Sequence, residues 1–284
     1  MKRRTGNIAV VTAYINSFSF YEVYLLNGFE KKNSELSEKY TINQYSTGGN
    51  NQKKKDLIKA LISESLADGV ISMFMKFDAE DLEELKKHNV PVVFIDEDSP
   101  GQHEIKLNNY KGAYDATQYL IKKGRKKIAL VSGSMGPEDV GVTPKERFDA
   151  YKKALADNNM AFDPNRVVEV VQYSFEEGEQ ALAELLKKDP SIDAVFSAAG
   201  DMVALGVLDE ALRQKIEVPQ QLSIVGYDDI NMAALSRPAL TTVKQPIVEM
   251  GYRSFELLCE TIDGKVKEPE TIVFEPKLIA RDSA

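Results

Sequence analysis

Arg147 and Asp228 are the residues whose type and position point most directly to chemistry with a small molecule. Arg147 falls in the first turn of a helical pattern that begins near Pro144. A cation there opposes the helix dipole, so another interaction must favour the arginine at this position. Its planar guanidinium can bind vicinal hydroxyls or a carboxylate through two N–H groups, while an ion pair within the protein explains the position equally well.

Asp228 and its neighbour Asp229 follow the apolar segment 222–225 and a glycine. They therefore project from the carboxyl end of an expected strand, the edge at which open parallel sheets bind their ligands. Adjacent carboxylates point in different directions, so an acid–base pair is not expected. We expect Asp228 to accept hydrogen bonds from ligand hydroxyls and Asp229 to have a structural role.

Aromatic residues also fall at expected strand ends. Tyr173 ends a β-rich run, and Phe20 and Tyr21 come shortly after the first expected strand. Aromatic faces can cover the C–H side of a sugar or stack on a base, with core packing as the alternative. Asp201 opens an apolar helix, and an N-cap role explains it fully.

Patterns for metal binding and catalysis are missing from the sequence. His88 closes a helix and His103 is expected in a polar loop, and neither has a second ligand at metal-binding spacing. The loop after the expected strand 127–132 contains neither G-x-S-x-G nor a phosphate-binding glycine pattern. We therefore expect no metal, no cofactor and no enzymatic activity.

Composition bounds the remaining classes. The 284 residues suffice for two domains, and 36 basic against 44 acidic residues give a net charge of −8, which argues against nucleic-acid binding by this chain. Apolar runs fall short of the roughly 18 residues that span a bilayer. The single cysteine, Cys259, lies in the apolar phase of a helix, which indicates core packing in a reducing compartment. With no secretory signal visible, a cytoplasmic location is expected.

Short β-branched runs alternate with amphipathic helical patterns along the chain, which predicts doubly wound α/β sheets. The pattern restarts near Tyr110, so two successive α/β units are expected, with a cleft between them. The late elements 247–263 and 270–274 are too few for a third domain and must complete the two sheets, which creates a hinge. Expected strands are 8–11, 41–45, 69–72, 91–95, 127–132, 167–171, 194–197 and 223–227.

Several segments, from about Thr5 to the end of the chain, resemble the effector-binding core of LacI/GalR-type transcriptional regulators. Exported sugar-binding proteins share the fold but usually lack the Leu-Thr-Thr-Val and Arg-Asp-Ser signatures, so the regulator is favoured. The segments that carry the resemblance are 5–11, 67–71, 91–96, 146–155, 204–206, 225–230, 240–246, 250–251 and 278–283.

The resemblance implies a type I periplasmic-binding-protein-like fold whose two subdomains are joined by three crossovers. The expected N-terminal subdomain contains residues 1–107 plus 243–275, and the C-terminal subdomain contains 108–242 plus 276–284. It further implies a homodimer that binds a sugar or sugar derivative in the cleft and so controls operator binding. No helix-turn-helix pattern precedes Thr5, so DNA would be bound through a headpiece missing from this chain.

The resemblance also assigns roles to individual residues. Arg147 and Asp228 match the family's principal polar effector contacts, and Tyr173 resembles its stacking aromatic. The remaining predicted contacts are Thr143 in the loop before the arginine, Phe20 and Tyr21 on the cleft face of the first helix, and Gln245 at a crossover.

Two departures from the family pattern bear on the effector. Gly200 precedes Asp201 where many members have asparagine, so an amide contact is expected to be missing. Asn108 stands where members often have aspartate, with Lys111 nearby, which suggests an acidic or phosphorylated sugar. The main hypothesis is the effector-sensing half of a regulator, and the alternative is an exported sugar-binding protein of an ABC transporter. An enzyme acting on sugars is the least favoured class.

Overall fold

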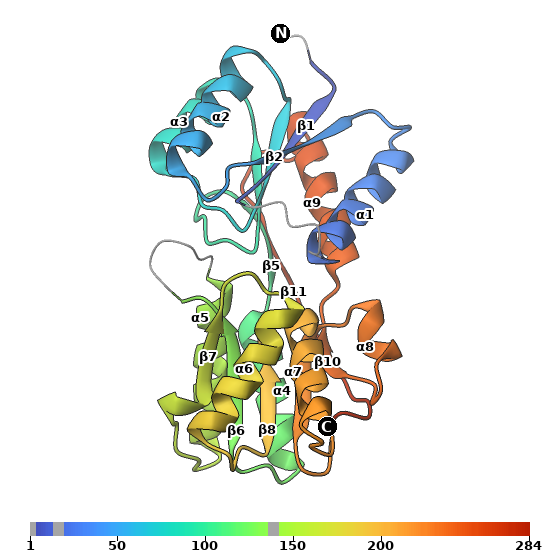
Figure 1. The fold of residues 1–284 in the computed structure, drawn as a ribbon. Coiled ribbons are helices and arrows are strands. Elements are labelled where there is room, and N and C mark those ends of the chain that lie inside the picture. The colour runs from blue at the N-terminus through green and yellow to red at the C-terminus, as the bar shows by residue number, and fades with distance from the viewer. Residues whose placement is uncertain (1–3, 14–19, 136–141) are drawn as a thin grey trace. The chain divides into compact units, whose positions relative to one another are not determined.

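The computed structural model describes residues 4–13, 20–135 and 142–284 (Figure 1). The chain divides into two compact units, which are described separately below. Unit 1 contains Met1–Leu107 and Pro246–Phe274, and unit 2 contains Asn108–Gln245 and Glu275–Ala284, so the chain passes between the units three times. Each unit is built on a six-stranded sheet.

Unit 1 has a parallel sheet with the strand order β11-β5-β4-β3-β1-β2. Helices α1 and α9 pack against each other on one side of this sheet, and α2 and α3 lie on the other (Figure 1). The strands are β1 (Asn7–Thr12), β2 (Thr41–Ser46), β3 (Gly69–Met73), β4 (Val92–Ile95), β5 (His103–Leu107) and β11 (Thr271–Phe274), and the helices are α1 (Phe20–Glu35), α2 (Asn51–Ser63), α3 (Ala79–Lys87) and α9 (Ile247–Ile262).

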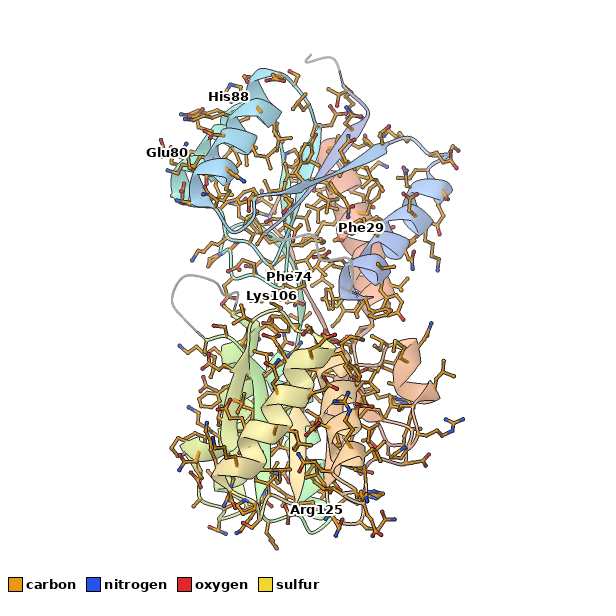
Figure 2. The ribbon with its side chains drawn as sticks, in the orientation of Figure 1. Phe29, Phe74, Glu80, His88, Lys106 and Arg125 are labelled. Atoms are coloured by element: carbon orange, nitrogen blue, oxygen red, sulfur yellow. The ribbon has the colours of Figure 1, made fainter. Side chains whose placement is uncertain are left out.

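The central strands of unit 1 are buried along their length, as expected for parallel strands covered on both faces. Helix α3 begins with a capping box between Asp78 and Asp81 and is followed by its C-cap His88, which Figure 2 labels. The His88 ring contacts the Glu84 carbonyl at 2.9 Å. The expectation of a loop at His103 is wrong. His103 begins β5 and is buried, its Nδ1 accepts from the Glu270 N–H, and burial lowers its pKa.

Unit 2 has the strand order β12-β10-β9-β8-β6-β7, in which β12 is antiparallel to β10 and the other pairs are parallel. Helix α4 packs on α5, and α6 packs on α7. The strands are β6 (Ile128–Gly133), β7 (Val167–Val170), β8 (Ala194–Ser197), β9 (Ser223–Asp228), β10 (Thr241–Lys244) and β12 (Lys277–Ile279), and the helices are α4 (Asn109–Lys122), α5 (Thr143–Asp157), α6 (Phe175–Lys188), α7 (Asp201–Arg213), the short α8 (Asn231–Leu235) and the 3-10 turn Pro164–Arg166.

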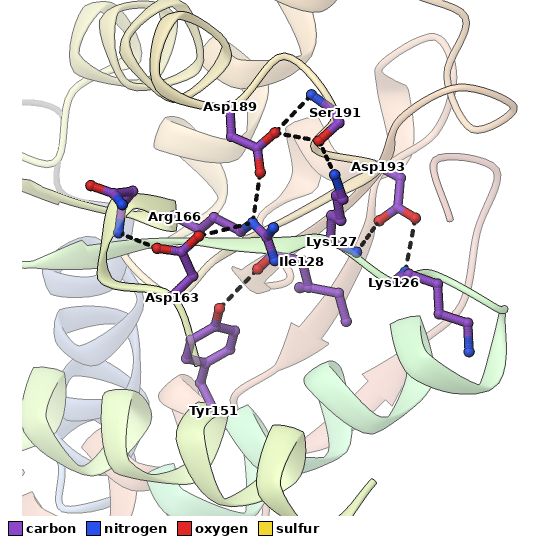
Figure 3. Close-up of polar contacts among 10 residues, drawn as sticks. Lys126, Lys127, Ile128, Tyr151, Asp163, Arg166, Asp189, Ser191 and Asp193 are labelled. Atoms are coloured by element: carbon purple, nitrogen blue, oxygen red, sulfur yellow. Dashed lines mark hydrogen bonds and ion pairs between the residues drawn. The ribbon is translucent and has the colours of Figure 1, made fainter. Parts of the chain in front are cut away.

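A polar network ties the loops at the amino-terminal edge of unit 2's sheet (Figure 3). The Asp193 carboxylate accepts the backbone N–H groups of Lys126 and Lys127, both at 2.8 Å. Asp189 accepts from Arg166 Nε at 2.9 Å, and hydrogen bonds from Ser191 are the largest cause that lowers the pKa of Asp189 to about 2. These charged groups are satisfied within the protein, so they hold loops in place at the edge opposite to the strand ends expected to bind ligands.

The α/β class and the two doubly wound, mostly parallel sheets are confirmed. The division differs in detail from the expected one, because residues 243–245 and residue 275 lie in unit 2. Val243 and Lys244 pair with β9 on one side and β12 on the other, which places them in the second sheet. Strands β5, β10 and β12 had no counterpart among the expected strands.

Candidate functional site

Polar residues gather beyond the carboxyl ends of β6, β8, β9 and β10, which are neighbours in the sheet of unit 2. Open parallel sheets bind their ligands at this kind of edge, because the loops there converge on a common space. The cluster, called the polar edge below, consists of Asn109, Thr143, Arg147, Asp201, Asp228 and Gln245.

The Arg147 guanidinium is fixed by hydrogen bonds and an aromatic ring. Nε and Nη2 donate to Asn109 Oδ1 at 3.0 and 2.8 Å, and Nη1 donates to the Ala198 carbonyl at 2.7 Å. The central carbon lies 3.7 Å from the centroid of the Tyr227 ring, a cation–π contact. Arg147 forms no ion pair within the described part of the chain. The internal ion pair that could have explained this buried arginine is therefore not found among the described residues.

Asn109 is a residue of the site that the sequence analysis missed. It is the first residue of α4, and its Nδ2 donates to Thr143 Oγ1 at 3.4 Å while its Oδ1 accepts from Arg147. Thr143 begins α5, so Asn109 ties the starts of two helices to the guanidinium. The signal was its place at the first helix of the second unit, directly after Asn108.

Asn108 and Lys111 do not join the polar edge. The Asn108 side chain accepts from the Lys111 N–H at 3.1 Å, which caps α4, and donates to Glu275 at 3.0 Å. Lys111 Nζ forms an exposed ion pair with Asp115 at 2.6 Å. Aspartate and asparagine both serve as N-caps, so this departure from the family pattern has a local structural role. The suggestion of an acidic effector held by Lys111 loses its support.

Asp228 ends β9 and presents its carboxylate beside the start of α7. Oδ1 accepts from Gln245 Nε2 at 2.5 Å, and Oδ2 lies 2.7 Å from where a Cβ at Gly200, the residue before α7, would stand. Burial raises the pKa of Asp228 to about 6, although the Arg147 charge and the hydrogen bond from Gln245 act in the opposite direction. The carboxylate is therefore ionised at neutral pH and has lone pairs for further donors.

The N-cap expectation for Asp201 is wrong. Asp201 is the first residue of α7, whose N-cap is Gly200, and the Asp201 side chain is fully buried. It accepts from the Ile230 N–H at 3.0 Å and from Thr242 Oγ1 at 2.5 Å, so it joins α7 to β10 and to the segment after β9. Burial and the Asp228 charge raise its pKa well above the ordinary value. Asp201 is thus a buried structural carboxyl.

Tyr173 follows β7 and has a left-handed backbone, with φ of 54°. A Cβ added at Gly133, the last residue of β6, would lie 2.1 Å from the Tyr173 hydroxyl, so this glycine makes room for the end of the ring. The hydroxyl end is enclosed there while 45% of the residue surface stays exposed. A partly exposed tyrosine at this strand end suits contact with a flat ligand surface.

Asp229 has the structural role expected of it. Its carboxylate pairs with Arg281 at 2.5 Å, and Arg281 also donates to the Leu240 carbonyl at 2.8 Å. The C-terminal segment is thereby attached to the loop after β9, and the two adjacent aspartates serve different partners.

Phe20 and Tyr21 belong to unit 1, where they begin α1. The Tyr21 hydroxyl donates to Asp96 Oδ2 at 2.8 Å, and its ring makes an edge contact with Phe74 at 5.0 Å between centroids. Asp96 is buried after β4, and its Oδ1 accepts the Leu107 N–H at 2.8 Å. Phe74 and Lys106, labelled in Figure 2, belong to the same carboxyl edge of unit 1. This cluster is the unit 1 counterpart of the polar edge.

Of the predicted site residues, four lie in the hydrogen-bonded polar edge of unit 2: Thr143, Arg147, Asp228 and Gln245. Tyr173 lies in the same unit, and Phe20 and Tyr21 lie in unit 1. Ligand binding by any of them remains a prediction. In the described ranges, no group of three or more His, Cys, Asp or Glu side chains could hold a metal ion. Among those same residues, no helix is long and apolar enough to cross a membrane.

Comparison with known proteins gives the family. The family described as a periplasmic binding protein-like domain matches residues 117–284. The HTH-type transcriptional repressor PurR of Vibrio atlanticus (strain LGP32) is 31% identical over 247 residues, which are 86% of this chain and 72% of that protein. Catabolite control protein A of Priestia megaterium is 30% identical over 280 residues, 96% of this chain and 81% of that protein.

A solved structure agrees with these relatives. The complex of the transcriptional regulator CelR with cellobiose superimposes with a TM-score of 0.86 and 29% identity, over 99% of this chain and 85% of that one. The relatives are transcriptional regulators rather than enzymes. They confirm the resemblance seen in the sequence, and the chain belongs to the LacI/GalR family of transcriptional regulators, as an effector-sensing domain with the periplasmic-binding-protein-like fold.

Proposed function

We propose that the polar edge of unit 2 binds the effector, a neutral sugar or sugar derivative, and that binding alters the affinity of the regulator for operator DNA. The observation that carries this proposal is the hydrogen bonding of the Arg147 guanidinium. Three of the five N–H donors of a guanidinium are engaged by Asn109 and Ala198. One N–H on each terminal nitrogen therefore remains for a ligand, on a group that its neighbours hold rigid.

The chemistry of the neighbours suits a polyhydroxyl compound. Arg147 offers two donors, and the Asp228 carboxylate offers acceptors. Vicinal hydroxyls match both, since each hydroxyl donates and accepts. Tyr173, which is 45% exposed, adds aromatic surface that suits the C–H side of a ring. The CelR structure, a complex with cellobiose, makes a β-linked glucose disaccharide the first compound to test.

The test is a thermal-shift panel on the purified chain. It contains cellobiose, glucose, ribose, glucose 6-phosphate, gluconate, adenine and guanine, because a ligand bound only by the native state raises the unfolding temperature. We expect a neutral sugar to raise the melting temperature of the wild-type protein. Arg147→Ala and Asp228→Asn should lose the shift, whereas Lys145→Ala, an exposed residue of the same helix turn, should keep it. A panel in which only the acidic compounds stabilise the protein contradicts the proposed ligand class.

The oligomeric state, the location and the mode of DNA binding implied by the family are proposed for this chain as well. We propose a homodimer that acts in the cytoplasm and binds operator DNA through a headpiece, without catalysis. The name of the relative from Vibrio atlanticus, an HTH-type transcriptional repressor, supports the DNA-binding part of this assignment. Sedimentation equilibrium distinguishes the dimer from the monomer expected of an exported binding protein.

A further inference from the structure

Gly200 lies between β8 and α7 with a backbone that side chains rarely allow. Its φ of 106° and ψ of 170° fall in a region populated almost only by glycine. A Cβ at this position would stand 2.7 Å from Asp228 Oδ2. The Asp228 carboxylate therefore occupies the space that a side chain at position 200 would need.

This placement gives α7 an anionic cap from a distant strand. Gly200 is the N-cap and has no side chain to bond the first turn. The Asp228 carboxylate instead lies at this helix start, 2.7 Å from where a Cβ of Gly200 would stand, and the positive end of the helix dipole favours an anion there. Asp228 itself has φ of 117°, a conformation that costs energy for a residue with a side chain and persists only where the surroundings fix it.

Gln245 supplies a second, independent observation. Its Nε2 donates to Asp228 Oδ1, which leaves Oε1 as the acceptor, and Oε1 is buried with no hydrogen-bond partner among the described residues. Gln245 is 4% exposed. A buried acceptor without a donor is costly, so a ligand that supplies a donor gains affinity there. Asp228 and Gln245 together form an acceptor end of the polar edge, opposite in character to the donor Arg147.

We propose that Gly200 is a specificity-determining position: its missing side chain lets the Asp228 carboxylate dock on α7, and the acceptor end so formed selects an effector with neighbouring O–H or N–H donors. Gly200, without a side chain, thus leaves room for the docked carboxylate at the start of α7. The proposal rests on the proposed function for the ligand, while the docking of the carboxylate is independent of it.

The docking is tested by NMR without a ligand. The chemical shift of an N–H beside a carboxylate changes as the carboxylate titrates, so the Asp201 amide at the start of α7 should report the ionisation of Asp228 between pH 5 and 7. Asp228→Asn should remove this component and leave only the titration of the Asp201 carboxyl itself, and Gly200→Ala should reduce the amplitude of the Asp228 component at least twofold. Gly124→Ala is the matched control, because Gly124 has φ of 89° and nothing within 4 Å of an added Cβ. It should retain the full amplitude.

Each outcome decides one part of the inference. An Asp201 amide that titrates in Gly200→Ala with the wild-type amplitude overturns the docking, and so does one that titrates in Asp228→Asn with the wild-type midpoint and amplitude. The comparison of Asp228→Asn with the wild type needs no change at Gly200, so it remains valid even where the Gly200→Ala variant does not fold. For the neutral sugar of the seven-compound panel that stabilises the wild type, Gly200→Ala should bind at least tenfold more weakly than the wild type. Gly124→Ala should bind it with wild-type affinity. Equal sugar affinity of Gly200→Ala and Gly124→Ala overturns the role of Gly200 in specificity. A panel in which no compound binds contradicts the proposed function, and the amide titration still decides whether the carboxylate docks on α7.

Discussion

Two nitrogens of Arg147, Nε and Nη2, donate to a single atom, Asn109 Oδ1, at 3.0 and 2.8 Å. The amide fixes the guanidinium without neutralising it, because asparagine carries no charge. The positive charge is thus held in place and remains available to a ligand. A residue that came to light only in the structure therefore determines the geometry of the principal residue found in the sequence.

Asn109→Ala should lower the free energy of unfolding by about 2–3 kcal/mol, because it removes two hydrogen bonds to a charged group in a buried site. It should also weaken effector binding, since Arg147 loses its orientation. Urea denaturation measures the first effect. Asn165→Ala, at an exposed position of the same unit, should change the stability by under about 0.5 kcal/mol. A cost for Asn109→Ala no larger than that of the control contradicts the positioning role.

Asp228 should make stability depend on pH in a direction opposite to most carboxylates. Its pKa is about 6 in the folded protein and about 3.8 in the unfolded chain, so the folded state binds more protons between these values. The free energy of unfolding therefore falls as pH rises from about 4 to 6, by roughly 3 kcal/mol once Asp228 is fully ionised.

The difference in unfolding free energy between Asp228→Asn and the wild type should accordingly increase from pH 4 to pH 7. Denaturation at each pH unit measures it, and taking the difference cancels the other titrating groups. A difference that stays constant from pH 4 to pH 7 would contradict a pKa of Asp228 raised by burial in the folded state.

Asp201→Ala should cost about 2–4 kcal/mol, because the Ile230 N–H and Thr242 hydroxyl would lose their partner in a fully buried place. Asp209→Ala, on the exposed side of the same helix, breaks only a surface ion pair with Arg213 and should cost about 0.5 kcal/mol. Thermal unfolding of both variants checks the contrast. Equal costs would mean that the buried carboxyl does not connect α7 to β10.

Gly133→Ala should displace the Tyr173 ring, because the added Cβ would lie 2.1 Å from the hydroxyl oxygen. Tyr173→Phe removes that oxygen, so the double variant should recover part of the stability that Gly133→Ala loses. Such non-additivity is the mark of direct contact between two residues. Strictly additive losses in a double-mutant cycle would place the Tyr173 ring away from Gly133.

The sequence predicted the α/β class, most strands and the edge that carries the polar residues, because hydrophobic periodicity and strand-end position are local signals. It could not predict that Asn109 serves Arg147, since the two residues meet through different helices. It assigned Asp201 to a cap because an aspartate before an apolar helix has that local explanation. The burial of Asp201 depends on Ile230 and Thr242, which lie far along the chain. The docking of Asp228 required the backbone of Gly200 to be known.

The most direct test of the effector site is calorimetric titration of the wild type, Arg147→Ala and Lys145→Ala with the neutral sugar that most stabilises the wild-type protein. The polar edge predicts that Arg147→Ala binds at least tenfold more weakly, a loss of about 1.4 kcal/mol or more, and that Lys145→Ala binds as the wild type does. Unchanged affinity of a folded Arg147→Ala variant would contradict effector binding at this edge.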